Sequence, residues 1–457
     1  MTGRCRHISD ARGSIRLAGA LVLIAIILLL GLLLALPLLL SQASVTSLIL
    51  DHIEQRTNYR LSTDATRISL FPRPSVELTN VLVRHAASHE PFFAAERLEL
   101  ALQVLPLFQG RVLGRYVVVD RPRLTIRREL SGRWSIGTDQ PEDDAESRSP
   151  LALLETAHNV LITGGLITVA DDMGKLFRKP IQFELTKAAV AEQVPGRSAR
   201  LEITGEIPQD KGRAAVQFDG TLLQGLHGDG VGPEEAFPLL MVEGDLRATR
   251  LDPRHVLSAW TPFEPVSDGL AGDVQVTAHV RFVPRSGGYD LTADEWRLQF
   301  WEIALQGTAA ATGLGTHHPR VTATLSATPV TLSRLLSQAP SAWVNAEKRG
   351  ALAKWSVDGL LTLQSLTLAG PMESGPAWTL SGSLAVNNGR FLMEPESPVV
   401  ENLSATLLYD TKQLRILDLR ALWGPVRIGG KELLITHWLE EPRYDLRLEG
   451  RASLAGL

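Results

Sequence analysis

The sequence predicts a mainly β protein that follows a single transmembrane helix at the N-terminus and contains a few short helices. Residues 17–40 form a run of 24 residues without a charged or strongly polar side chain. Beyond this run, apolar and polar residues alternate in short segments, and turn signals separate the segments at regular intervals. That alternation is typical of antiparallel strands with one apolar face.

The apolar run is long enough to span a bilayer as a helix. Such a helix covers about 36 Å, and the hydrocarbon layer is about 30 Å thick. The preceding tail, residues 1–16, carries four arginines and one acid, Asp10. Because basic residues collect on the cytoplasmic side, we expect a cytoplasmic tail and the rest of the chain across the membrane. A cleaved signal peptide is the alternative, but its apolar region is usually shorter, about 7–15 residues.

The composition narrows the compartment and the partners. The formal net charge is −4 and the pI is about 6.3, so no basic field indicates a nucleic-acid partner. The single cysteine, Cys5, lies in the predicted cytoplasmic tail, so the exported part has no disulfide and no cysteine ligand for a metal. These features favour a bacterial periplasm, and we expect a single-pass protein of the bacterial inner membrane.

An N-terminal β domain is predicted over residues 41–136. Apolar residues recur at helical spacing over residues 45–57, which predicts a short amphipathic helix. The period then changes to two, which predicts a series of strands. Their segments lie at residues 67–70, 76–83, 98–104, 117–119, 124–126 and 132–136.

A linker and a short helix are predicted next. Residues 137–150 read GTDQPEDDAESRSP, an acidic stretch without a large apolar residue, which indicates a linker. A Ca²⁺ loop is the alternative, but the acids at positions 139, 142, 143 and 144 lack the spacing of an EF-hand. The apolar residues of Leu151–Val160 predict a short helix.

Residues 151–457 predict a repetitive β region with one apolar face. Apolar residues alternate with polar ones over residues 274–282, 321–327 and 403–409. A strand, a short helix and another strand over residues 246–276 recur over residues 325–366, which indicates an internal repeat. The candidate residues for the apolar face are Val274, Val276, Val280, Phe282, Val321, Leu325, Leu403 and Leu407.

So many one-sided strands need a cover for their apolar face. The predicted helices are too few and too short to provide it. Two arrangements remain open from the residues alone: a second sheet packed on the first, or lipid lying in an open groove.

Several segments, in order, resemble the AsmA family of inner-membrane-anchored periplasmic proteins. They include Ile68-Ser-Leu-Phe-Pro-Arg-Pro74, Ala95-Glu-Arg-Leu-Glu-Leu-Ala-Leu102 and Val119-Asp-Arg-Pro-Arg-Leu-Thr-Ile126. Residues 380–454 resemble the family's C-terminal repeats, with Leu384-Ala-Val-Asn-Asn-Gly-Arg-Phe391 and Leu417-Asp-Leu-Arg-Ala-Leu-Trp-Gly424. The resemblance implies an elongated, twisted β-sheet groove, related to bridge-like lipid transfer proteins. It implies a role in phospholipid movement or outer-membrane assembly, and no catalytic residues.

No catalytic, metal or cofactor site is predicted. His85 and His89 are four residues apart, but they lie in a turn-like stretch without a third ligand. His317 and His318 precede a proline and read as a loop. The glycine-rich segment at 228–232 is not followed by a helix, as a phosphate loop would require.

Two functions therefore remain as hypotheses. The first is a membrane-anchored protein without enzymatic activity that binds phospholipid or another acyl-chain lipid and supports phospholipid transport and outer-membrane biogenesis. The second is a scaffold or assembly factor for outer-membrane proteins, with the apolar face filled by its own side chains. A membrane-tethered hydrolase is a third alternative that no motif favours. Residues 449–454 resemble the start of a third repeat, so we expect a longer native chain, an envelope protein that adds a strand at this edge, or fraying.

Overall fold

The computed structural model describes most of the chain after the predicted anchor. The described residues are 59–69, 75–85, 91–102, 114–130, 159–194, 198–224, 240–259, 272–285, 288–300, 303–314, 316, 318–338, 350, 353–372, 378–392, 398–437 and 443–451. The predicted anchor at 17–40, the amphipathic helix at 45–57 and the linker at 137–150 lie outside these ranges. Within them, no helix is both long and apolar enough to cross a membrane.

The described strands form one sheet of 22 strands. They are β1 (Tyr59–Ser62), β2 (Ala65–Ser69), β3 (Ser75–His85), β4 (Pro91–Leu102), β5 (Gly114–Asp120), β6 (Arg123–Arg128), β7 (Asn159–Asp171), β8 (Ile181–Val194), β9 (Ser198–Gln209), β10 (Gly212–Gln224), β11 (Leu240–Leu251), β12 (Val274–Arg285), β13 (Gly288–Phe300), β14 (Ile303–Leu314), β15 (Arg320–Ala327), β16 (Val330–Thr331), β17 (Asp358–Pro371), β18 (Thr379–Phe391), β19 (Val400–Asp410), β20 (Gln413–Trp423), β21 (Val426–Thr436) and β22 (Arg443–Arg451). The mainly β fold class is therefore confirmed.

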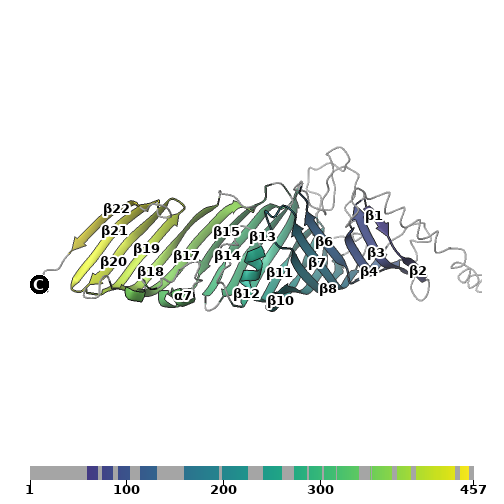
Figure 1. Cartoon of the computed structure of the whole chain (residues 1–457), viewed down its shortest axis with the longest axis horizontal. Helices are drawn as coiled ribbons and strands as arrows, with labels where there is room; N and C mark the ends of the chain where they lie inside the picture. Colours follow the sequence, from purple (N-terminus) through teal and green to yellow (C-terminus); the bar gives the residue numbers. More distant parts are fainter. Residues whose placement is uncertain are drawn as a thin grey trace, which may run out of the picture.

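Strand order across the sheet follows strand order along the chain. From β7 to β15 and from β17 to β22, each strand pairs antiparallel with the next one. Three pairs of short strands share one row each: β1 with β2, β5 with β6, and β15 with β16. The sheet is consequently long in the direction of its hydrogen bonds, with β1 and β2 near one end and β22 at the other (Figure 1).

The prediction of a purely antiparallel sheet is wrong at one junction. Strands β5 and β6 both run parallel to β7. A parallel pair needs a long connection that returns the chain to the same end of the sheet, and residues 129–158 provide one between β6 and β7. The strands on either side of this junction are antiparallel, as the alternation predicts. The sequence pattern did not reveal the crossover between them.

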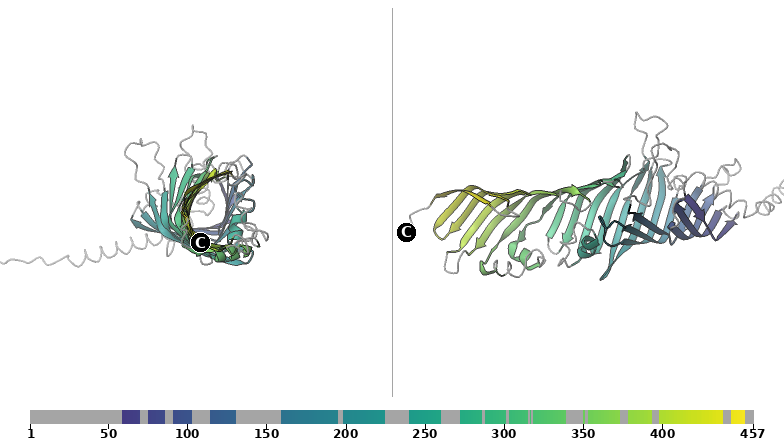
Figure 2. Two further views of the ribbon diagram at one scale, coloured as in Figure 1. Left: turned by 90° about the vertical axis from the view of Figure 1, so that its left-hand side faces the viewer. Right: turned by 45° about the horizontal axis from the view of Figure 1, so that its top comes forward.

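Local irregularities bend the strands. Glu295, Asn388 and Asn402 have positive φ angles of 53°, 51° and 54°, and each lies at a register shift in its ladder. An extra residue in one strand of a pair bends that strand and increases its twist. Seen along its long axis, the sheet curves around a common centre (Figure 2).

Two short helices follow the internal repeat predicted from the sequence. Helix α5 (Pro253–Ala259) connects β11 to β12, and helix α7 (Leu332–Gln338) connects β16 to β17. Asp252 caps α5, since its Oδ1 accepts the backbone N–H of Arg254 at 3.0 Å. Pro253 starts α5, a position where a missing N–H costs nothing. Helix α7 packs against β16 and β17.

Strand β7 begins inside a predicted helix and ends in a turn. The helix over Leu151–Val160 is wrong at its end, because Asn159 and Val160 begin β7; residues 151–158 are outside the described ranges. A turn follows β7 at Asp172 and Met173. The Asp171 carboxylate accepts the backbone N–H groups of Met173 at 3.1 Å and Leu176 at 2.6 Å, which fixes the chain reversal after β7.

The tightest core lies at the N-terminal end of the sheet. Its buried residues come from β3, β4, β5 and β7, and Val81 is 0% exposed. Leu78, at 5% exposed, and Val81 share this core although they are three residues apart. Asn80 between them has a φ of 50°, which reverses the alternation of side chains.

We predict that Val81→Ala lowers the free energy of unfolding of this end of the sheet by roughly 2 kcal/mol, because it leaves a cavity in a closed core. Val280→Ala, at a half-buried position of β12, is the matched control and should cost well under 1 kcal/mol. Hydrogen exchange of peptides from β3, β4 and β12 in increasing urea measures both. Equal losses at the two positions would contradict the placement of the core.

Candidate functional site

The structure places the predicted apolar residues of β12 on one face together with their neighbours. Val276 pairs with Ala248 of β11 and with Leu298 of β13. Phe282 pairs with Val242 and Leu291 on the same two strands. Residues that pair directly across strands point to the same side of a sheet, so these apolar side chains form continuous rows.

The rows continue toward the C-terminal end. Leu325 pairs with Gly307 of β14 and Leu366 of β17. Leu407 pairs with Leu384 of β18 and Ile416 of β20. Every direct partner named here is apolar or glycine. The structure therefore brings the predicted candidates at 274–282, 321–325 and 403–407 onto one shared apolar face; their contact with lipid stays a prediction.

Exposure differs sharply between the two faces. Of the eight candidates Val274 is 3% exposed, and the other seven, Val276, Val280, Phe282, Val321, Leu325, Leu403 and Leu407, are half-buried. The polar residues between them, such as Gln275 and Arg281, are exposed, and the His279 side chain is 38% exposed. Since curvature crowds the side chains on the inside of a bent sheet, this pattern assigns the apolar side chains to the concave face.

The apolar face has little cover from other described elements. Contacts between the described strands and helices are almost entirely those of sheet neighbours, with α7 against β16 and β17. A sheet packed against a second layer would bury its leucines fully. In this sheet, the large apolar side chains from β12 onward shield one another only in part.

The candidate list from the sequence missed β7–β10. Ile203 of β9 pairs with Ala188 and Phe218, and Leu201 pairs with Val190 and Gly220, so the apolar face extends through these strands. Alternation at Leu201, Ile203 and Ile207 was the available signal. The stacked rings of Phe282 and Tyr289, with centroids 4.8 Å apart, are a second feature of the face that the sequence did not indicate.

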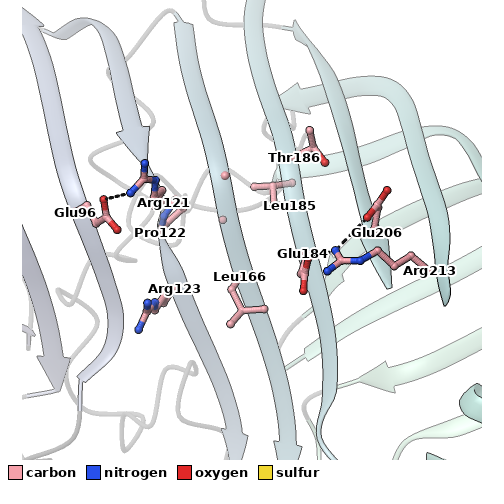
Figure 3. Close-up of a pocket in the computed structure, with 12 residues that line it drawn as sticks. Glu96, Arg121, Pro122, Arg123, Leu166, Glu184, Leu185, Thr186, Glu206 and Arg213 are labelled. Carbon is pink, nitrogen blue, oxygen red and sulfur yellow. Dashed lines mark hydrogen bonds and ion pairs between the residues drawn. The ribbon is translucent and has the colours of Figure 1, made fainter. Parts of the chain in front are cut away.

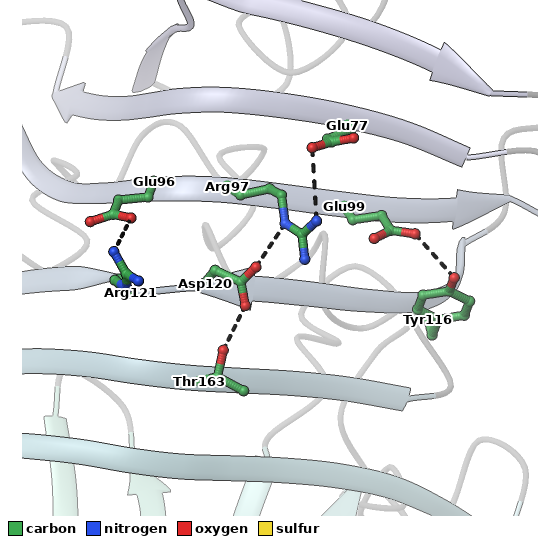
Figure 4. A network of polar contacts seen from close by, with 8 residues as sticks. All are labelled: Glu77, Glu96, Arg97, Glu99, Tyr116, Asp120, Arg121 and Thr163. Carbon is green, nitrogen blue, oxygen red and sulfur yellow. Dashed lines mark hydrogen bonds and ion pairs between the residues drawn. The ribbon is translucent and has the colours of Figure 1, made fainter.

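The opposite face carries ion pairs that join neighbouring strands (Figure 4). The Asp120 carboxylate accepts hydrogen bonds from Thr163 Oγ1 at 2.6 Å and from Arg97 Nε at 2.7 Å. The hydrogen bond from Thr163, together with the guanidinium of Arg97, holds the pKa of Asp120 below its usual value. The same contact raises the pKa of Arg97. These bonds link β4, β5 and β7 across the antiparallel-to-parallel junction.

The comparisons with known proteins address the N-terminal half of this sheet. The AsmA family model matches residues 14–228. The resemblance to the AsmA family predicted from the sequence is confirmed over these residues. A match to this family suggests a function connected with the cell envelope. No curated protein and no solved structure matches the chain. The AsmA match covers β1 to β10, and the same sheet continues into β11–β22, where the eight candidate residues lie.

A polar cleft of about 540 Å³ lies within the AsmA segment, where β5 gives way to β6 (Figure 3). Arg121 there has a φ of 47°, and Gly164 of β7 has a φ of 63°, so both strands deviate at the same level. Arg121 donates to Glu96 at 2.8 Å, and Arg213 lies between Glu184 and Glu206. Arginines and glutamates alternate around the cleft, so it offers no strong preference for either sign of charge.

The residues that the structure describes contain no cluster of three or more potential metal ligands. His85 ends β3, and His318 lies in the exposed turn before β15, while His89 and His317 are outside the described residues. The predicted absence of a catalytic, metal or cofactor site stays a prediction.

We predict that Asp120→Asn lowers stability by about 1 kcal/mol at pH 7 because a charged acceptor of two hydrogen bonds is lost. The carboxylate has a lowered pKa in the folded protein. Its contribution is therefore present above the unfolded pKa, about 3.9, and is lost as the pH falls through the folded pKa.

Urea titrations at pH 7 and in acid test this prediction, with the exposed Asp273→Asn as the control. The Asp120 variant and the unsubstituted protein should converge in acid. A difference that persists below both pKa values would assign the effect to packing.

Proposed function

We propose that this chain is an envelope protein, anchored in the inner membrane, whose concave apolar face binds the acyl chains of phospholipids. In this proposal it supports phospholipid movement and outer-membrane biogenesis without catalysing a reaction. The observation that carries the proposal is the continuous apolar face, which runs from β7 to β21 with little cover from other described elements.

The extent of the face suits acyl chains better than a compact ligand. Rows of strands lie about 4.8 Å apart, so a sheet of this size extends on the order of 80 Å, well beyond the thickness of a hydrocarbon layer. A face with this extent accommodates several acyl chains in series. The side chains that line it offer no charge to fix one particular head group.

Energetics favour an apolar occupant. Burying a leucine fully contributes roughly 1.5–3 kcal/mol, and half-buried leucines leave much of this unused. An exposed apolar patch larger than a few hundred Å² is uncommon on soluble proteins and marks a ligand or membrane contact. Acyl chains on the concave face would remove this area from water without requiring hydrogen-bond partners.

The sequence and the family match support the proposed location. The apolar run 17–40 and the basic tail before it favour an inner-membrane anchor with the sheet on the periplasmic side. A family match that begins at residue 14 includes this run. We propose that the anchor delivers the N-terminal end of the sheet to the membrane surface, where lipid would enter.

An envelope protein is a second proposed partner. Strand β22 pairs with β21 and with no other described strand, so its outer backbone groups can accept a further strand from another chain. Such an addition would extend the sheet in the direction of its long axis.

We predict that Leu325→Asp reduces acyl lipid bound to the full-length chain about tenfold or more, because a charge on the concave face excludes acyl chains. Leu325 pairs with Gly307 and Leu366, so the new carboxylate has no polar partner among its direct neighbours. Thr324→Asp, one residue earlier on the exposed face, is the matched control and should retain lipid. Organic extraction and lipid mass spectrometry of the purified proteins measure both.

The alternative, a scaffold whose apolar face is filled by its own side chains, gives a different result. The unsubstituted protein would then yield no bound lipid, and Leu325→Asp would unfold the sheet. Circular dichroism of each variant separates loss of lipid from loss of fold.

We predict that a reporter that is active only in the periplasm gives activity when fused at the C-terminus, and that a reporter restricted to the cytoplasm does not. Replacing the four arginines of residues 1–16 by neutral residues should weaken this orientation. Activity of the cytoplasmic reporter with the natural tail would overturn the proposed location.

A further inference from the structure

Four aromatic rings of the apolar face lie against strand glycines. A Cβ atom added to Gly205 would come within 2.5 Å of Phe183 Cζ, and one added to Gly220 within 2.6 Å of Phe218 Cζ. At Gly370 the same atom would lie 2.5 Å from Cδ2 of Trp378, and at Gly382 it would lie 2.6 Å from the Tyr409 hydroxyl. Each ring therefore occupies the space that a side chain at the glycine would take.

These contacts lower the rings toward the backbone. Side chains in a sheet usually stand perpendicular to it. A ring that covers a glycine lies down along the sheet and projects less into the space above it. Phe218 covers two glycines at once, since a Cβ on the paired Gly244 would also come within 2.9 Å of its ring. Burial of this kind also raises the pKa of Tyr409.

The four pairs occur at intervals along the sheet. Gly205, Gly220 and Gly244 belong to β9, β10 and β11, and Gly370 and Gly382 belong to β17 and β18. These four rings are thus lowered both in the AsmA segment and in the strands beyond it. An upright ring at any of these four positions would narrow the space above the face at that row of strands, so the repetition is the significant feature.

We propose that these glycine–aromatic pairs set the clearance above the concave face and thereby determine whether acyl chains can pass along it. This inference rests on the proposed function and assigns these glycines and aromatic residues a role in it. The glycines are the specificity-determining positions, because any side chain there lifts the ring into the path of the ligand.

Gly370 offers the most selective test of this role. At Gly205, Gly220 and Gly382 a backbone oxygen of the neighbouring strand is also the nearest atom to an added Cβ or lies as close as the ring. At Gly370 the three nearest atoms all belong to the Trp378 ring, at 2.5, 2.8 and 2.9 Å. Gly370→Ala should thus displace the indole by about 1 Å to reach ordinary contact at 3.4 Å, without forcing the strands apart.

The experiment uses the full-length chain in vesicles of phosphatidylethanolamine and phosphatidylglycerol that contain a trace of phosphatidylcholine with a diazirine in its acyl chain. After irradiation, crosslinked lipid in peptides of β17 and β18 is quantified per amount of protein. The variants are Gly370→Ala, Trp378→Ala and the double variant. Gly350→Ala is the matched control, because a methyl group there meets no atom within 4 Å.

We expect Gly370→Ala to reduce crosslinking in these peptides about tenfold and the double variant to restore it, since the lifted ring is then absent. Trp378→Ala alone and Gly350→Ala should match the unsubstituted protein. Equal crosslinking in Gly370→Ala would overturn the inference and leave the proposed function intact. Loss in both Gly370→Ala and the double variant would also overturn it, because the glycine would then serve the fold. Absence of crosslinks in the unsubstituted protein would overturn the proposed function itself.

Discussion

The whole structure depends on one constraint: a single sheet has one apolar face and, in the described residues, little that packs on it. Backbone hydrogen bonds between neighbouring strands hold the sheet together, and they are indifferent to what lies above it. Side-chain burial must then come from curvature. Where the strands bend, apolar residues of adjacent rows crowd one another, and this partial shielding is what Leu325 and Leu407 have in place of a second layer.

The two ends of the described sheet solve this problem differently. At the N-terminal end, Val76, Val81 and Val117 form a closed core with exposures of 3%, 0% and 6%. From β12 onward, full burial is confined to a few positions, mostly alanine and valine, while the leucines stay half-exposed. A rigid base next to an adaptable, open surface is a suitable combination for a protein that must be held in place and still accept a flexible ligand.

Much of the fold could be predicted from alternation alone. Leu98 and Leu100, or Leu403 and Leu407, follow strict period two, and the register places each pair on one face as expected. Predictions from alternation were wrong where the backbone leaves the regular strand conformation or where two strands pair parallel. Leu78 and Val81 share a core only because Asn80 takes a left-handed conformation, and the parallel pairing of β7 depends on a crossover that leaves no periodic trace. Asparagines inside strand patterns, as at Asn388 and Asn402, were the available signal for such departures, because asparagine tolerates positive φ.

The sequence predicted that the candidate site is an apolar face of the sheet, but it predicted only some of the strands over which this face extends. Apolar character at positions 274–282 is visible in the sequence because apolar residues alternate there with the polar residues at 275, 277, 279 and 281. The glycines under the aromatic rings were not interpretable, because a glycine in a strand pattern has several explanations until the residue above it is known. Gly370 and Trp378 are eight residues apart and face each other only through the β17–β18 hairpin.

Each strand from β7 onward pairs only with adjacent strands, and this limits how the chain can change in evolution. Each strand from β7 onward depends on the strands beside it, as repeats do in a solenoid. Inserting or deleting a hairpin adds or removes two strands. Such a change would keep the direction of the following strands and the face to which their apolar side chains point, and it would alter the length of the sheet by about 10 Å. The junction of β5, β6 and β7 lacks this freedom, because its crossover fixes three strands together. The length of the sheet can therefore change by insertion or deletion of hairpins beyond β7, whereas the junction of β5, β6 and β7 must stay the same.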